Sequence, residues 1–109
     1  MSVIRGERFT GRWDYDGKPI YDKVFSFSTL GNNSDVSQAS GLSGIVVKSL
    51  YGIVTSAGGF SFNLPYAIKD ATSCISLWYD NNTKNIGIGT GKDRSGDSAI
   101  VTIEYKYNS

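Results

Sequence analysis

The run Trp78-Tyr79-Asp80-Asn81 places two aromatic rings directly before a carboxylate and an amide. Aromatic faces with a polar edge suit half-wet surfaces, where sugar rings stack on them and neighbouring polar groups bind the sugar hydroxyls. The run is therefore a candidate carbohydrate-binding site. The alternative is structural, because a tryptophan such as Trp78 or Trp13 can equally fill a core or a subunit interface.

A second candidate group consists of Lys92, Asp93 and Arg94, which lie in a polar loop between Gly91 and Asp97. Their charged side chains could contact a saccharide at the surface. Asp93 and Arg94 could instead hold the loop together, so both roles stay open at this point.

Catalysis by the common nucleophile–base pairs is excluded within this chain, because it contains no histidine and one cysteine. Ser-His-Asp and Cys-His machinery and His- or Cys-based zinc sites need those residues. Cys74 is expected to be a small apolar residue buried in a strand. The aspartates are expected to be solvated turn residues, because no sugar cleft is evident between any pair of them. We therefore expect no enzymatic activity and no cofactor.

Two further patterns could hold ligands but have simpler explanations. The oxygens of Asp80, Asn81 and Asn82 suit calcium, yet their spacing matches no defined calcium loop, so no metal site is expected. The run Gly87-Ile88-Gly89-Thr90-Gly91 contains closely spaced glycines, but a phosphate-binding loop must open a helix. Here the glycines lie in a predicted strand, where they would let a neighbour pack closely.

The formal net charge of +1 excludes some classes of partner. Proteins that bind nucleic acid through phosphate contacts, and polybasic membrane anchors, carry a basic excess that this chain lacks. No apolar run approaches the roughly 18 residues of a membrane span. The start MSVIRGERF has no signal-peptide pattern, so we expect synthesis in the cytoplasm, no membrane insertion and no nucleic-acid partner.

Short alternating apolar segments predict an all-β, antiparallel β-sandwich with jelly-roll-like connectivity, formed as a single domain over residues 1–109. Residues 28–43 are expected to form a long loop with at most one weak strand, and residues 1–7 a flexible lead or a linker from a longer fibre. Strands are expected at 9–13, 20–27, 44–55, 60–65, 74–79, 85–90 and 98–107. Tyr21, Phe25 and Phe27 are predicted to face the core. Ile86 and Ile88 are predicted to share one face of their strand, and Ala99, Val101, Ile103, Tyr105 and Tyr107 one face of theirs.

The corner between the first two expected strands has strong turn chemistry. Gly17 supplies conformational freedom and Pro19 restricts the backbone, so Asp16-Gly17-Lys18-Pro19 is expected to set a turn. We assign Trp13, Asp16, Gly17, Lys18, Pro19 and Tyr21 to a structural motif.

The same corner carries a resemblance to a known family. The segment TGRWDYDGKPIYDKVF resembles the form TGxxWIDGKPIYRKxxxF, which is common in phage tail fibre, tailspike and receptor-binding proteins. It departs from that form at Asp14-Tyr15, which lengthens the corner by one residue, and at Asp22, which replaces an arginine. The residues shared are Thr10, Gly11, Trp13, Asp16, Gly17, Lys18, Pro19, Ile20, Tyr21, Lys23 and Phe27.

The second half of the chain resembles the same family. Leu64-Pro65 resembles its apolar-Pro strand end and Ile75-Ser76-Leu77 its strand of the ISLxx type. The final part resembles the ending xxTGxDRSxxxAxVTxEY. The resemblance therefore spans about residues 8–107. The residues that match the ending are Thr90, Gly91, Asp93, Arg94, Ser95, Ala99, Val101, Thr102, Glu104 and Tyr105.

The resemblance implies a component of a phage virion, at the tail or a surface fibre, that attaches to the host. Such modules are β-sandwiches that assemble as trimers and are not themselves enzymes. The expected function is a receptor-binding tip that binds host cell-surface carbohydrate as a homotrimer, with other tail or baseplate proteins as further partners. The alternative is a structural cap that drives trimerisation or folding of a fibre and has no ligand of its own.

Overall fold

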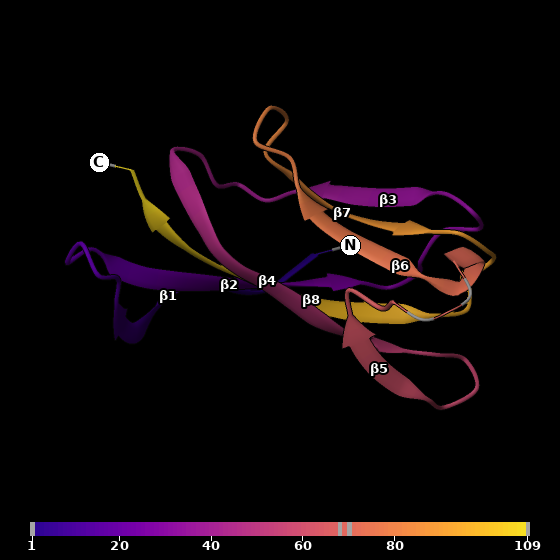
Figure 1. Cartoon of the computed structure of the whole chain (residues 1–109). Coiled ribbons are helices and arrows are strands. Elements are labelled where there is room, and N and C mark those ends of the chain that lie inside the picture. The colour runs from indigo at the N-terminus through magenta and orange to yellow at the C-terminus, as the bar shows by residue number, and fades with distance from the viewer. Residues whose placement is uncertain (1, 68, 70, 109) are drawn as a thin grey trace.

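The computed structural model describes residues 2–67, 69 and 71–108, which form eight β-strands and one short 3-10 helix (Figure 1). No helix in this part of the chain is long and apolar enough to cross a membrane. The elements are β1 (Ser2–Trp13), β2 (Pro19–Phe27), β3 (Asp35–Ala39), β4 (Ile45–Thr55), β5 (Ser61–Leu64), η1 (Ala71–Ser73), β6 (Ile75–Tyr79), β7 (Asn85–Thr90) and β8 (Ser98–Tyr107).

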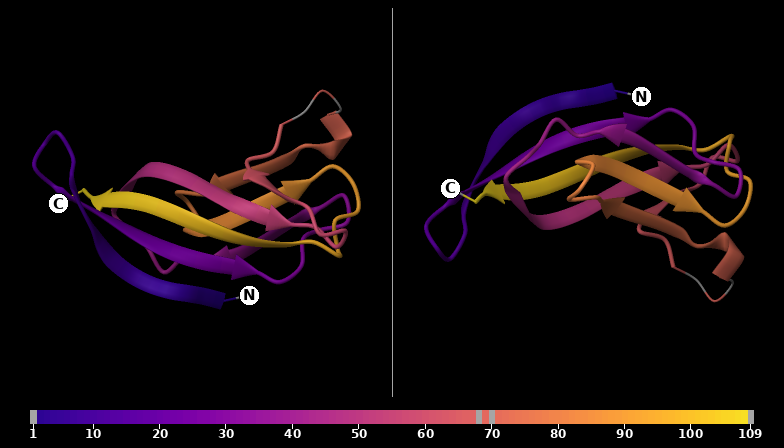
Figure 2. Two further views of the ribbon diagram at one scale, coloured as in Figure 1. Left: turned by 90° about the horizontal axis from the view of Figure 1, so that it is seen from below. Right: turned by 90° about the horizontal axis from the view of Figure 1, so that it is seen from above.

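The strands form two antiparallel sheets that face each other, as Figures 1 and 2 show. The larger sheet has the order β1-β2-β8-β4-β5 and the smaller one the order β3-β7-β6. Because β2 pairs with β8 in one sheet and β3 with β7 in the other, the pairing is nested as in a jelly roll. The predicted all-β, antiparallel sandwich is confirmed.

The core lies between the two sheets and includes side chains that the alternation predicted, together with Leu30, Leu42, Ile45, Val54, Leu64 and Ile75, which it did not. Phe25 and Phe27 on β2 are fully buried, and Tyr21 packs at the edge of the core, where its ring stacks on Tyr105 at 6.3 Å between centroids. Ile86 and Ile88 of β7 meet them from the smaller sheet. On β8 the predicted face is confirmed: Ala99, Val101, Ile103 and Tyr105 are buried, and Tyr107 packs against the cluster.

The weak strand that was allowed within residues 28–43 is present as β3, where Val36 and Gln38 alternate toward the core. Two local predictions differ from the structure. β1 begins at Ser2 rather than at residue 9, so residues 2–7, which were expected as a lead or linker, pair with β2, because the β2 edge offers unpaired backbone groups. Cys74 is half-buried between η1 and β6 rather than buried within a strand.

The smaller sheet covers only part of the larger one. In both views of Figure 2, the β1–β2 turn and the end of β8 lie together beyond the end of β3, β7 and β6. Aromatic side chains occupy this uncovered part of the inner face. Phe9 contacts Trp13 edge to face at 5.2 Å between ring centroids, and Tyr21 contacts Tyr107 at 5.6 Å. Phe9 is 45% exposed and Trp13 63% exposed.

The Asp-Gly-Lys-Pro corner is tied to the C-terminal strand by charges. Asp16 accepts a hydrogen bond from the Lys18 backbone N–H at 3.0 Å, and Gly17 has a φ of +84°. The Lys106 ammonium on β8 bonds Asp16 at 2.5 Å and Asp14 at 2.7 Å, and Lys48 reaches Asp14 at 3.0 Å. The corner therefore connects β1 and β2 to β4 and β8.

These ion pairs make the stability of the corner dependent on pH. Hydrogen bonds from Lys106 and then Lys48 lower the pKa of Asp14 from 3.8 to about 2, and Lys106 also lowers the pKa of Asp16. A carboxylate whose folded pKa is lowered stabilises the fold above its unfolded pKa, and this contribution disappears as the pH falls through the folded value. The loss is therefore expected between about pH 4 and pH 2.

Asp14→Asn tests this pH dependence. The variant is expected to be less stable than the wild type at pH 5 and to lose less stability between pH 4 and pH 2. Urea unfolding at a series of pH values gives the free energy of unfolding of both proteins, and from it the slope of that free energy against pH. Equal slopes for the two proteins would contradict the expectation.

Candidate functional site

The indole ring of Trp78 lies flat against the outer face of the smaller sheet. Trp78 pairs with Gly87 in the β6–β7 register, and its neighbours Leu77 and Tyr79 pair with the core residues Ile88 and Ile86. Because side chains alternate between faces, Trp78 and Gly87 point away from the core. A β-carbon at Gly87 would lie 2.4 Å from Cε2 and Cζ2 of Trp78, so only glycine leaves room for the ring.

Gly89 continues this platform by one step along β7. It pairs with Asp35 of β3 on one side and with Ser76 of β6 on the other. A β-carbon at Gly89 would lie 2.8 Å from both Oδ1 of Asp35 and Oγ of Ser76, and 3.1 Å from Cζ3 of Trp78. A carboxylate, a hydroxyl and an aromatic ring therefore surround one point above the strand.

The next position along β3 extends the polar border of the ring. Ser37 pairs with Gly87, so it lies in the same row across the sheet as Trp78, and its side chain is exposed. The outer face of the smaller sheet thus combines one half-buried indole with short polar groups. Such an arrangement can stack a flat apolar ring face and bond hydroxyl groups at its edge.

Of the predicted site residues, Tyr79 does not join Trp78. It lies on the core side of β6, where its hydroxyl donates a hydrogen bond to the Leu42 carbonyl at 3.0 Å. The two aromatic residues are adjacent in sequence, and adjacent residues of a strand face opposite sides. Tyr79, which was predicted to bind a ligand together with Trp78, therefore lies on the opposite face of β6.

Asp80 and Asn81 lie in the turn between β6 and β7. Asp80 Oδ1 accepts hydrogen bonds from the backbone N–H of Asn82 at 2.8 Å and of Thr83 at 3.4 Å. These bonds lower the pKa of the Asp80 carboxyl. The Asp80 side chain thus stabilises the turn, while Asn81 is exposed at its tip.

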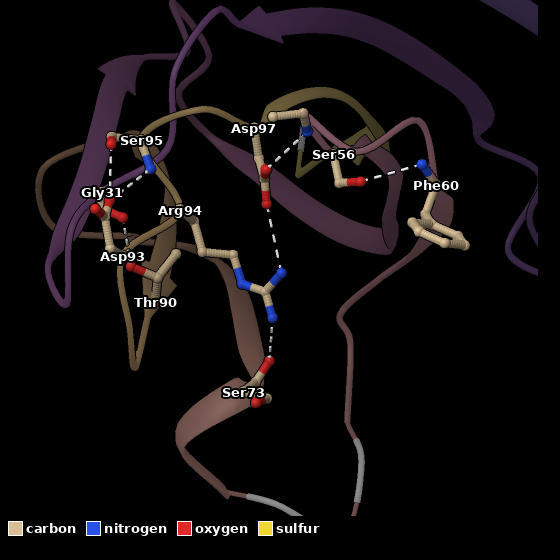
Figure 3. A network of polar contacts seen from close by, with 10 residues as sticks. Gly31, Ser56, Phe60, Ser73, Thr90, Asp93, Arg94, Ser95 and Asp97 are labelled. Carbon is tan, nitrogen blue, oxygen red and sulfur yellow. Dashed lines mark hydrogen bonds and ion pairs between the residues drawn. The ribbon is translucent and has the colours of Figure 1, made fainter.

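In the second candidate group, the Arg94 side chain makes contacts inside the domain that hold its loop in place (Figure 3). Its guanidinium donates to the Ser73 carbonyl at 2.7 Å and pairs with Asp97 at 3.4 Å. It also lies over the rings of Phe62 and Tyr66, 5.4 Å and 5.8 Å from their centroids. With 10% of its side chain exposed, Arg94 has little surface left for a ligand.

Lys92 and Asp93 directly precede Arg94 in the same loop, and both are exposed. Asp93 Oδ1 accepts hydrogen bonds from the Ser95 N–H at 3.0 Å and hydroxyl at 2.7 Å, which lower its pKa (Figure 3). The Lys92 carbonyl accepts a bond from Asn33, and its side chain is exposed. This loop follows the last residue of β7, whereas Asn81 precedes the first. The two predicted groups therefore lie at opposite ends of the smaller sheet.

Other surfaces offer less chemistry. A groove of about 610 Å³ crosses the outer face of the larger sheet, lined by Tyr51, Ile53, Asn63 and Ile100 among others. It is mostly apolar and carries no free charge, because Glu104 beside Tyr51 pairs with Arg12 at 2.8 Å. Within the described residues, no cluster of three or more Asp, Glu, His or Cys side chains could hold a metal ion.

Trp78 was a candidate from the sequence, but the sequence did not place Asp35, Ser37 and Ser76 beside it. The glycines of β7 were recognised as places where a neighbour packs closely, and that neighbour is Trp78. The sequence contains no clear signal for β3, which lies in a polar segment. Its pairing with β7, which brings Asp35 and Ser37 beside Trp78, therefore could not be predicted. Comparison of the chain with protein-family models, curated proteins and solved structures finds no match.

Proposed function

We propose that this chain is a non-enzymatic receptor-binding domain of a phage tail fibre, which binds host cell-surface carbohydrate as a homotrimer within the virion. The class of protein is supported by the resemblance of both halves of the chain to tail-fibre modules. The carbohydrate site is supported by one observation above all: Trp78 lies flat on the glycine backbone of β7, bordered by Asp35 and Ser76. A small core and exposed aromatic residues at one end of the sandwich favour assembly with other copies.

Removing the indole tests the site. Trp78→Ala is expected to weaken the affinity for the glycan that the wild type binds best by at least about tenfold, which corresponds to about 1.4 kcal/mol of lost stacking. The measurement is a glycan array followed by titration of the best glycan against the purified protein. Thermal unfolding and light scattering establish that the variant stays folded and keeps the assembly state of the wild type.

Phe60→Ala is the matched control, because it removes another aromatic ring that is 73% exposed and lies in the β4–β5 turn of the larger sheet. It should bind as the wild type does. Trp78→Phe keeps an apolar cover over the glycines and should retain part of the affinity. Unchanged binding by a folded Trp78→Ala protein would remove Trp78 from the proposed site.

A second candidate function is a structural cap that holds a fibre trimer together without a ligand. It is favoured by the uncovered aromatic cluster of Phe9 and Trp13 at the end of the large sheet. Light scattering on the wild-type protein separates the two functions when combined with the array. A trimer that binds no glycan supports the cap, a trimer that binds one supports the receptor-binding tip, and a monomer contradicts both.

A further inference from the structure

From the charges around Trp78 we infer that the site takes a neutral saccharide, with Asp35 accepting hydrogen bonds from its hydroxyl groups, and rejects sugars that carry a carboxylate. This inference rests on the proposed function, since it names the class of ligand for the same surface. It depends on three features of the outer face of the smaller sheet: the lack of an internal partner for the Asp35 carboxylate, the position of Asp35 beside the indole, and the absence of lysine and arginine from the strands.

Asp35 differs from the other acidic residues that the structure describes, because its carboxylate has no hydrogen-bond or ion-pair partner in the described part of the chain. Its side chain is exposed. Every other Asp and Glu that the structure describes has a partner in the chain, namely Glu7, Asp14, Asp16, Asp22, Asp80, Asp93, Asp97 and Glu104. A carboxylate that the fold does not use is available to a ligand.

The position of Asp35 suits a ligand stacked on Trp78. Its Oδ1 and Cζ3 of the indole lie 2.8 Å and 3.1 Å from the same point above Gly89. A pyranose ring stacked on the indole would therefore carry its edge hydroxyls toward the carboxylate. A carboxylate accepts two such hydroxyl donors at once, and these charge-assisted bonds are stronger than neutral ones.

The strands around the ring supply no positive charge. The outward-facing positions of β3, β6 and β7 are Asp35, Ser37, Ala39, Ser76, Trp78, Asn85, Gly87 and Gly89. A sugar acid stacked on Trp78 would bring its carboxylate toward Asp35 with no lysine or arginine on these strands to compensate. Like charges at close range oppose binding, so the surface discriminates by repulsion as well as by attraction.

The test compares Asp35→Asn with the wild type on two sets of probes. The neutral set contains glucose-, galactose-, mannose- and N-acetylglucosamine-terminated glycans, and the acidic set contains glucuronic, galacturonic and sialic acid glycans. The wild type should bind a neutral glycan and no acidic one. Asp35→Asn should weaken neutral binding by about tenfold, because bonds to a charged acceptor become bonds to an amide, and should lower the preference for neutral over acidic glycans.

The controls separate this inference from the function on which it rests. Glu7→Gln removes the same charge from β1 in the other sheet and should leave both sets of affinities unchanged. Asp35→Asn should unfold at the wild-type temperature, since Asp35 has no internal partner in the described chain. If Trp78→Ala abolishes binding of an acidic glycan that the wild type prefers, or if Asp35→Asn binds neutral glycans as the wild type does, this inference is overturned and the proposed site stands. If the wild type binds no glycan, both are overturned.

Discussion

Gly52→Ala is expected to lower the free energy of unfolding by about 3 kcal/mol, at the upper end of the usual cost of overpacking. Gly52 is buried in β4, between β8 and β5. A β-carbon at this position would lie 2.5 Å from the Ile100 carbonyl oxygen and 3.2 Å from the Val101 Cα. Both are backbone atoms of the central strand β8, so no side-chain rotation relieves the clash and the strands must separate.

Gly6→Ala is the matched control for this experiment. Gly6 also lies in a strand, but nothing lies within 4 Å of its β-carbon position. Alanine there should be neutral or slightly stabilising, because it reduces the freedom of the unfolded chain. Urea unfolding of the two variants measures the difference. Equal stability of Gly52→Ala and Gly6→Ala would show that β4 and β8 can separate at little cost.

Arg94→Ala is expected to produce the second large effect, a loss of about 2–3 kcal/mol of unfolding free energy. The substitution leaves the Asp97 carboxylate without its ion pair and the Ser73 carbonyl without its 2.7 Å hydrogen bond. It also removes the cation from the rings of Phe62 and Tyr66. Breaking a fully satisfied buried pair costs about 3–5 kcal/mol, but the Arg94 Nε has no hydrogen-bond partner in the described chain, which lowers the expected loss.

Two further variants distinguish a brace from a ligand contact. Arg94→Lys keeps the charge but lacks the planar fork that reaches Ser73 and Asp97 together, so it should recover only part of the stability. Lys92→Ala removes an exposed neighbour and should leave stability unchanged. Chemical unfolding measures stability, and titration with any bound glycan measures affinity. Wild-type stability of Arg94→Ala, together with lost glycan binding, would return Arg94 to the ligand site.

The contrast between Trp78 and Arg94 clarifies where function can reside in this domain. Arg94 belongs to the stretch whose sequence resembles the ending of tail-fibre modules, yet its contacts are internal. The corner that carries the other match ties β1 and β2 to Lys106 of β8. The contacts of both segments therefore hold the sandwich together. The side chains that remain available to a ligand lie on the outer face of the smaller sheet, around Trp78 and Asp35.

The sequence by itself determined the fold class and most strand positions. Alternation along 20–27 marked Phe25 and Phe27 as core residues, and alternation along 98–107 placed Val101 on one face with its neighbours; all three side chains are fully buried. This pattern is readable because strand side chains alternate with a period of two, whatever partner the strand finds. Turn residues such as Asp16-Gly17 act within a few positions, so they were equally visible.

Only the tertiary structure decided which residues share a surface. Trp78 and Tyr79 are neighbours in sequence but lie on opposite faces of β6, whereas Asp35 and Trp78 are far apart in sequence and meet above Gly89. Register between strands depends on long-range pairing, and a slip of one residue would exchange the two faces. The weak pattern of β3 did not determine that register, so the carboxylate beside the indole emerged only from the folded sheets.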